Sequence, residues 1–142
     1  MRYDPAHALD LLRRTAYGRL SVSLRALPVI TVARHIVTGD GRILLRTHAG
    51  FGYARACDGV VVAYGADNLA DRAGDDEAVW TAQCVGTART ATPGPAELEL
   101  FGPAPRTADD APFVPEYLCV EPQFSTVHHL EGVPARRVAH SA

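Results

Sequence analysis

The sequence predicts a mainly β protein with short helices, folded as a small closed or half-closed antiparallel barrel in a single domain over residues 1–142. From Arg19 onward, apolar and polar residues alternate with the period of two that is typical of strands with one buried face. Glycine and proline turns separate these segments, and the long helical crossovers that a parallel sheet needs are missing between successive strands. With 47% apolar residues, the chain can bury one hydrophobic core.

The first half of the chain is expected to form one helix and three strands. Asp4 and Pro5 provide an N-cap and a proline at the first helical position, and apolar residues then recur at helical spacing until Gly18. The expected strands cover residues 19–25, 29–37 and 42–47, and Gly39-Asp40-Gly41 joins the last two as a hairpin.

The second half is expected to add three strands, which makes six. Residues 60–64 form a continuous apolar run, typical of a buried strand, and residues 79–92 alternate over a long stretch. The last strand is expected at 117–127, with a short helix or loop at 49–58, a short helix at 95–101 and loops at 65–77 and 102–112. The tail from Glu131 is expected to fray or to pack on another subunit.

Composition excludes several classes of function. All fourteen basic residues are Arg, so the chain has no Lys for a Schiff base or for a phosphate-binding P-loop. The net charge of −2, with no basic block, implies neither a nucleic-acid nor a membrane partner. Three widely spaced cysteines and a polar N-terminus predict a cytoplasmic protein without disulfides.

Arg46 and Thr47 end the third expected strand and precede a glycine-containing turn that includes Gly50. A guanidinium, a hydroxyl and backbone N–H groups that glycine leaves accessible are the donors that bind phosphate. The alternative is that Arg46 ends the strand in solvent, where it contributes little to folding, and that the glycines only turn the chain.

Other candidates each have a structural alternative. Arg34 and His35 are adjacent in a strand, so one of them must point into the barrel or an interface, and His35 suits either hydrogen bonding or proton transfer. Trp80 either packs in the core or contacts a planar ligand. No metal site is expected from His128-His129, because adjacent strand side chains diverge, and no nucleophile motif supports covalent catalysis.

Taken together, three segments resemble the flavin-binding split barrels related to pyridoxamine 5'-phosphate oxidase, especially the short bacterial flavin and deazaflavin oxidoreductases. Their order and separation across residues 8–125 carry the resemblance. The segments are Leu11-Leu12 with Tyr17-Gly18-Arg19-Leu20-Ser21-Val22, then Gly41-Arg42-Ile43-Leu44-Leu45-Arg46-Thr47, and Val79-Trp80-Thr81-Ala82-Gln83-Cys84-Val85-Gly86-Thr87-Ala88.

The resemblance implies a six-stranded antiparallel split β-barrel of the FMN-binding type, which forms a homodimer with two FMN sites at the subunit interface. It implies hydride transfer between the flavin and a nicotinamide or another small-molecule substrate. Flavin performs this chemistry itself, which agrees with the lack of a nucleophile or metal motif. Carried over by position, the flavin is lined by Val32, Ala33, Arg34 and His35, its phosphate is bound by Arg46 and Thr47, and Trp80 lies near the ring or the dimer wall.

The chain departs from the family pattern at two places. Phe51-Gly52 stands where many relatives have a Thr-Lys pair, and Val32-Ala33-Arg34-His35 stands where many have Pro-Val-Asn-Tyr. These departures leave open a deazaflavin as the cofactor, a split barrel that binds a flavin or tetrapyrrole without turnover, and a structural domain without a cofactor.

Overall fold

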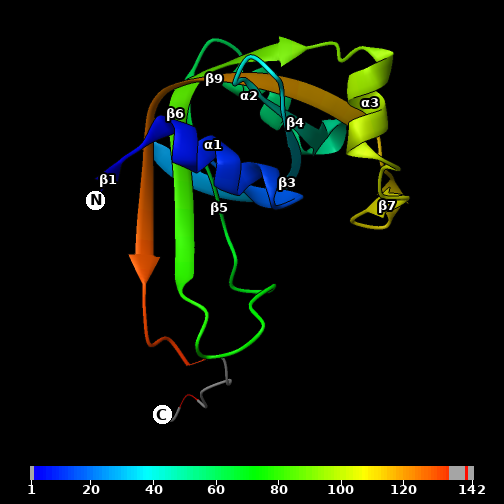
Figure 1. The fold of residues 1–142 in the computed structure, drawn as a ribbon. Coiled ribbons are helices and arrows are strands. Elements are labelled where there is room, and N and C mark those ends of the chain that lie inside the picture. Colours follow the sequence, from blue (N-terminus) through cyan, green and yellow to red (C-terminus); the bar gives the residue numbers. More distant parts are fainter. Residues whose placement is uncertain (1, 135–139, 141–142) are drawn as a thin grey trace.

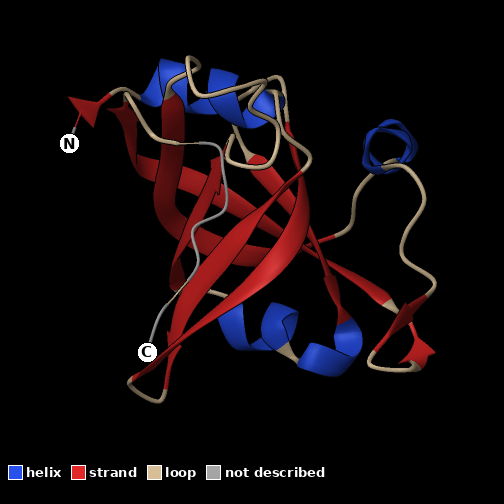
Figure 2. Cartoon of the chain, turned by 90° about the horizontal axis from the view of Figure 1, so that it is seen from below, coloured by secondary structure: helices blue, strands red, loops and turns tan. Residues whose placement is uncertain are grey.

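Within the residues that the computed structural model describes, 2–134 and 140, six long antiparallel strands form a barrel (Figures 1 and 2). The sheet order is β1-β9-β4-β3-β2-β5-β6, and an additional pairing of β9 with β6 closes it. The predicted split-barrel fold is confirmed. The barrel strands are β2 (Tyr17–Leu24), β3 (Leu27–Val37), β4 (Ile43–His48), β5 (Val61–Asp67), β6 (Val79–Ala91) and β9 (Pro115–Leu130).

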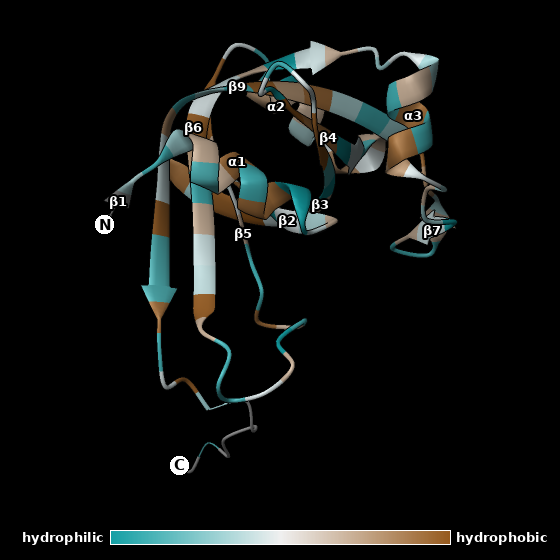
Figure 3. Ribbon diagram, in the orientation of Figure 1, coloured by the Kyte–Doolittle hydropathy of each residue, from teal (hydrophilic) through white to brown (hydrophobic). Residues whose placement is uncertain are grey.

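Closure depends on β9, which pairs with β4 through its first part and with β6 from Tyr117 to Leu130. The register between β6 and β9 shifts between Val85 and Gly86, where Phe124 lies opposite Val85 and Pro122 lies opposite Gly86. The extra residue on β9 forms a bulge, which bends the strand. A side chain at position 86 would collide with the backbone of Glu121, so this bend requires glycine. Along β9, hydrophobic and hydrophilic residues follow each other in bands (Figure 3).

The helices cover parts of the barrel wall. α1 (Pro5–Arg13) is N-capped by Asp4, which accepts the His7 N–H at 3.2 Å, and it lies across the barrel in Figure 1. It ends at Arg13, short of the expected Gly18, because Gly18 belongs to β2. The expected short helical segment after β4 is present as η1 (Ala49–Phe51) and α2 (Tyr53–Cys57), and the expected α3 spans Pro95–Phe101.

Three short strands were not expected from the sequence. β1 (Arg2–Tyr3) pairs with β9, while β7 (Thr107–Ala108) and β8 (Ala111–Pro112) form a separate hairpin inside the expected 102–112 loop. Asp109 and Asp110 turn this hairpin with φ values of 50° and 63°. Aspartate tolerates this left-handed region better than most residues, so two aspartates suit a tight turn of this kind.

The C-terminal tail is described only for residues 131–134 and 140, so the expected arm at 135–139 and 141–142 lies outside the described residues. Among the described helices, none has both the length and the apolar character needed to cross a membrane. The three cysteines are free and buried.

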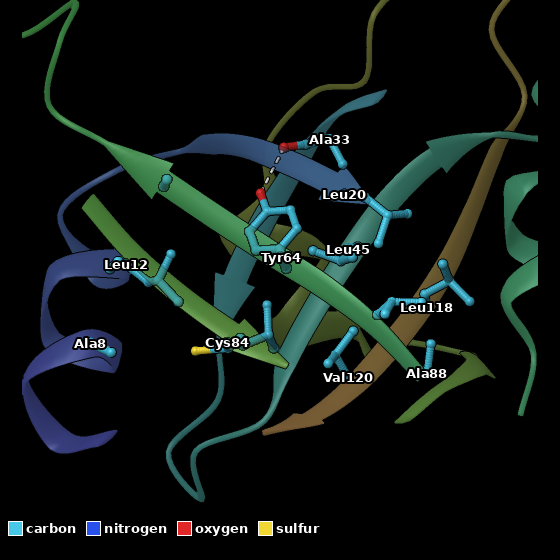
Figure 4. Packing of buried hydrophobic residues seen from close by; sticks show 14 of the residues in the cluster. Ala8, Leu12, Leu20, Ala33, Leu45, Tyr64, Cys84, Ala88, Leu118 and Val120 are labelled. Carbon is cyan, nitrogen blue, oxygen red and sulfur yellow. Dashed lines mark hydrogen bonds between the residues drawn. The ribbon is translucent and has the colours of Figure 1, made fainter. Parts of the chain in front are cut away.

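The barrel interior holds a polar pair inside an apolar core. Tyr64 on β5 lies among Leu20, Leu45 and other buried side chains, and its hydroxyl donates to the Ala33 carbonyl at 2.9 Å (Figure 4). His35 points inward from β3 with Nδ1 2.5 Å from that hydroxyl and Nε2 2.8 Å from the Leu12 carbonyl. Since a carbonyl only accepts, Nε2 carries the proton. In the neutral ring Nδ1 is then an acceptor, so it shares the single hydroxyl proton of Tyr64 with the Ala33 carbonyl. His35 thus ties β3 to the end of α1.

Burial lowers the pKa of His35 below its usual 6.5, and the Arg34 charge lowers it further against the opposing effect of the Leu12 carbonyl. In the folded protein the imidazole therefore stays neutral in a pH range where the unfolded chain takes up a proton. The same burial raises the pKa of Tyr64.

We therefore expect the free energy of unfolding to be highest above pH 6.5 and to fall as the pH drops from 6.5 toward the lowered pKa of folded His35. The contribution of one proton is at most about 1.4 kcal/mol per pH unit. Urea unfolding between pH 8 and 5 measures it. His35→Gln should flatten the slope, whereas the matched change of the exposed His128, His128→Gln, should not. An unchanged slope in His35→Gln would contradict the buried neutral imidazole.

Candidate functional site

A cavity of about 180 Å³ lies on the outer face of the barrel, over β3 and β4. It brings together five of the eight residues predicted from the sequence to bind a cofactor: Val32, Ala33, Arg34, Arg46 and Thr47. The others are not in its wall. The remaining lining residues are Tyr17, His48, Phe51, Pro105 and Phe113. A second cavity of about 340 Å³ shares Tyr17 and Val32 with the first, so the two are adjacent, and we call them together the β3 groove.

Strand pairing positions the polar side chains of the β3 groove. Tyr17, Arg34, Arg46 and Tyr117 are directly opposite one another across β2, β3, β4 and β9, and so lie in one row on one face of the sheet. Alternation along β3 sends Arg34 outward and His35 into the core, as the sequence predicts for two adjacent strand residues. Val32 also faces outward, with 62% of its surface exposed, and offers an apolar wall.

Arg34 is held by backbone carbonyls of two elements. Its guanidinium donates to Leu100 at 2.8 Å, to Phe101 at 3.2 Å and to Ala16 at 3.2 Å. Leu100 and Phe101 end α3, where the last carbonyls of a helix have no partner within the helix. Arg34 therefore caps α3 from the neighbouring strand.

Arg46 has the same role. It donates to the Gly102 carbonyl at 2.8 Å and to the Tyr117 hydroxyl at 3.3 Å, and its guanidinium lies 4.9 Å from the centre of the Phe101 ring. Only 5% of its surface is exposed. The expectation that Arg46 ends the strand in solvent and contributes little to folding is wrong, because α3 folds back over β4 and covers it.

Thr47 and Gly50 also have structural contacts. Thr47 is buried and its hydroxyl donates to the Glu116 carbonyl at 3.4 Å. Gly50 leaves room for the His48 ring, because a Cβ at position 50 would lie only 2.5 Å from Nε2 of His48. Gly50 belongs to η1 and does not line either cavity.

The cavity also has five lining residues that were not predicted as site residues: Tyr17, His48, Phe51, Pro105 and Phe113. His48 accepts the Val114 N–H through Nδ1 at 3.0 Å and packs between the rings of Phe113 and Phe51, whose centres lie 5.1 and 5.0 Å away. The only sequence feature that could have pointed to His48 as a site residue is its place directly after Arg46-Thr47. Nothing in the sequence connects it with Phe113.

Trp80 and His35 lie elsewhere. Trp80 belongs to the main core cluster, and its backbone N–H donates to Asn68 at 2.9 Å. His35 is committed to Tyr64 and Leu12 inside the barrel. Trp80 and His35 thus both serve the interior of the barrel, Trp80 by packing and His35 by hydrogen bonds. Within residues 2–134 and 140, no group of three or more His, Cys, Asp or Glu side chains is placed to hold a metal ion.

Because Arg46 is buried and caps α3, its loss should destabilise the fold. We expect Arg46→Ala to lower the free energy of unfolding by about 2 kcal/mol, because it leaves the Gly102 carbonyl and the Tyr117 hydroxyl without their charged donor. Urea denaturation followed by circular dichroism measures the loss. Arg106→Ala, which removes an exposed arginine of the same chain, should cost less than about 0.5 kcal/mol. Equal effects of the two changes would contradict the capping role.

Solved structures with a similar fold cover most of this chain. An FAD binding protein from Mycobacterium smegmatis superimposes with a TM-score of 0.66 at 24% identity, over 90% of this chain and 96% of that one. A candidate pyridoxamine 5'-phosphate oxidase from Corynebacterium glutamicum gives 0.66 at 20% identity, over 90% and 95% of the two chains. A conserved protein of unknown function from Corynebacterium diphtheriae gives 0.64 at 14% identity, over 90% and 94%.

No match was found among curated proteins. The sequence profile of the family described as Pyridoxamine 5'-phosphate oxidase, however, matches residues 4–127, which include all six barrel strands except the last three residues of β9. Together with the closed six-stranded barrel, this match shows that the chain belongs to the pyridoxamine 5'-phosphate oxidase family.

Proposed function

We propose that this chain binds a flavin in the β3 groove and acts as a flavin-dependent oxidoreductase. The observation that carries the proposal is that five of the residues predicted to bind a cofactor line one cavity of a chain from this family. The structural similarity to an FAD binding protein supports it. A bound flavin would supply hydride transfer with a nicotinamide or another small molecule, and the chain would bind and orient the ring.

The walls of the groove suit the planar ring of a flavin. Tyr17 and Val32 are large apolar side chains that stay exposed on the outer face of the sheet, where the two cavities meet. Phe51 and Phe113 add aromatic surface at one end. Aromatic and aliphatic walls with few polar groups are typical of sites for planar ligands. These walls therefore suit a flavin ring.

A second copy of the chain is the proposed partner. Ile30 and Val32 protrude from β3, and Ile30 is 66% exposed. Ile30 borders a hollow of about 380 Å³, whose lining combines small residues such as Ala63 and Gly65 with the charged Arg19 and Asp67. An exposed apolar ridge beside a shallow hollow on the same face is self-complementary under a two-fold axis. Such a dimer would cover the β3 groove and exclude water from a bound ring.

The proposed compartment is the cytoplasm. Three free cysteines, all buried, suit a reducing environment.

The flavin proposal predicts binding that depends on Val32. Titration of riboflavin and FMN into the purified protein should quench flavin fluorescence, and Val32→Glu should weaken binding by on the order of tenfold or more, because it places a charge against the ring. The control is Leu130→Glu, at an exposed apolar residue at the end of β9. If the wild type binds neither flavin, the proposal fails. Binding of a deazaflavin alone would replace it.

The dimer proposal predicts that the wild type elutes at twice the chain mass in gel filtration with light scattering, and that Ile30→Arg elutes as a monomer. Arginine at this exposed position would put a charge into the apolar contact without entering the core. An unchanged circular dichroism spectrum would confirm that the variant is folded. A wild type that is monomeric at micromolar concentration would rule out the interfacial site.

A further inference from the structure

Resting on the proposed function, we infer that the β3 groove selects a flavin by its ring system and not by its terminal phosphate, so that riboflavin and FMN bind with similar affinity. Three features of the groove carry this inference: its arginines already bind backbone carbonyls, acidic residues lie at its other end, and Phe51-Gly52 stands where the resemblance leads one to expect a Thr-Lys pair.

The two arginines over β3 and β4 are already bound to carbonyl groups. Arg34 uses its Nε and both terminal nitrogens on backbone carbonyls, and Arg46 donates to Gly102 and Tyr117. The carbonyl oxygens at the end of α3 thus occupy the place that an anion would take between two guanidinium groups. A phosphate would have to displace them, and exchanging one hydrogen bond for another yields little net affinity.

The hydroxyl predicted to assist the arginines is committed in the same way. Thr47 donates to the Glu116 carbonyl in the ladder between β4 and β9 and is almost fully buried. If the Thr47 hydroxyl turned toward a ligand, its hydrogen bond to the Glu116 carbonyl would be lost. All three side chains predicted to bind phosphate or to lie beside it therefore serve the fold.

The other end of the β3 groove disfavours an anion. Arg19 lies there, but it forms an ion pair with Asp67 at 3.2 Å, and Asp71 lines the same cavity. The formal charges of these three side chains sum to −1. A phosphate at this end would meet a net negative wall, which opposes binding.

Phe51 provides the third observation and a direct test. It lines the cavity with 43% of its surface exposed, and it is one of the two residues that stand where many relatives have a Thr-Lys pair. Since the chain contains no Lys, no lysine ammonium group is available from any other position. A lysine introduced here would be a cation at the groove without a structural partner.

The experiment compares riboflavin with FMN, which share the ring and differ by the phosphate, by fluorescence titration in low salt. For the wild type we expect dissociation constants within about fivefold of each other, whereas a free charge-assisted contact to phosphate is typically worth roughly tenfold to a hundredfold. Phe51→Lys should favour FMN over riboflavin by about tenfold, and added salt should reduce that preference. The matched variant Phe51→Leu should show no preference.

Arg46→Ala provides a further readout. If Arg46 acts only through α3, its removal should change the affinities for riboflavin and FMN by the same factor. A wild type that binds FMN more than about fivefold more tightly than riboflavin would overturn the inference while leaving the flavin proposal intact. Selective loss of FMN affinity in Arg46→Ala would overturn it as well. Failure of both flavins to bind would overturn the proposed function itself.

Discussion

The barrel exists because one strand, β9, pairs with β4 on one side and β6 on the other and so joins the two ends of the sheet. A sheet closed in this way has no free edge in its body, but its strands must bend, and the bulge where Pro122 faces Gly86 supplies the bend. Once the sheet is closed, each strand has one face in a small interior and one face outside. That division places His35 beside Tyr64 and Arg34 in the β3 groove, although the two residues are adjacent in the chain.

Local periodicity explains what could be predicted. Alternation identified strands such as β2 and β6 because the two-residue repeat is a property of each strand alone, whereas a continuous apolar run identified β5. The same repeat implied that Arg34 and His35 diverge. The short strands β1, β7 and β8 have two residues each, too few to show a period. The hairpin between β2 and β3 turns at Arg25 and Ala26 with φ values of 51° and 65°, a conformation that neither residue type signals.

The environment of Arg46 could not be predicted, because it is made by residues far along the chain. Phe101, Gly102 and Tyr117 are more than fifty positions away, and the neighbours of Arg46 in sequence give no sign that a helix covers it. Physically, two like charges face each other across β3 and β4, an arrangement that is unfavourable by itself. The carbonyl end of α3 offsets it, so the arginines stabilise the helix end and the helix makes the arginine pair tolerable.

α3 is attached to the barrel mainly through side chains. Among the described strands, β7 and β8 pair only with each other, and α3 is held to the barrel by Arg34, Arg46 and the packing of Phe101. These side-chain contacts can break without unpairing the barrel, so we expect residues 95–112 to open more readily than the barrel strands. Pro105 belongs to this segment and walls the β3 groove. Opening of this segment would remove the Pro105 wall, while the walls that Tyr17 and Val32 supply from β2 and β3 would stay in place.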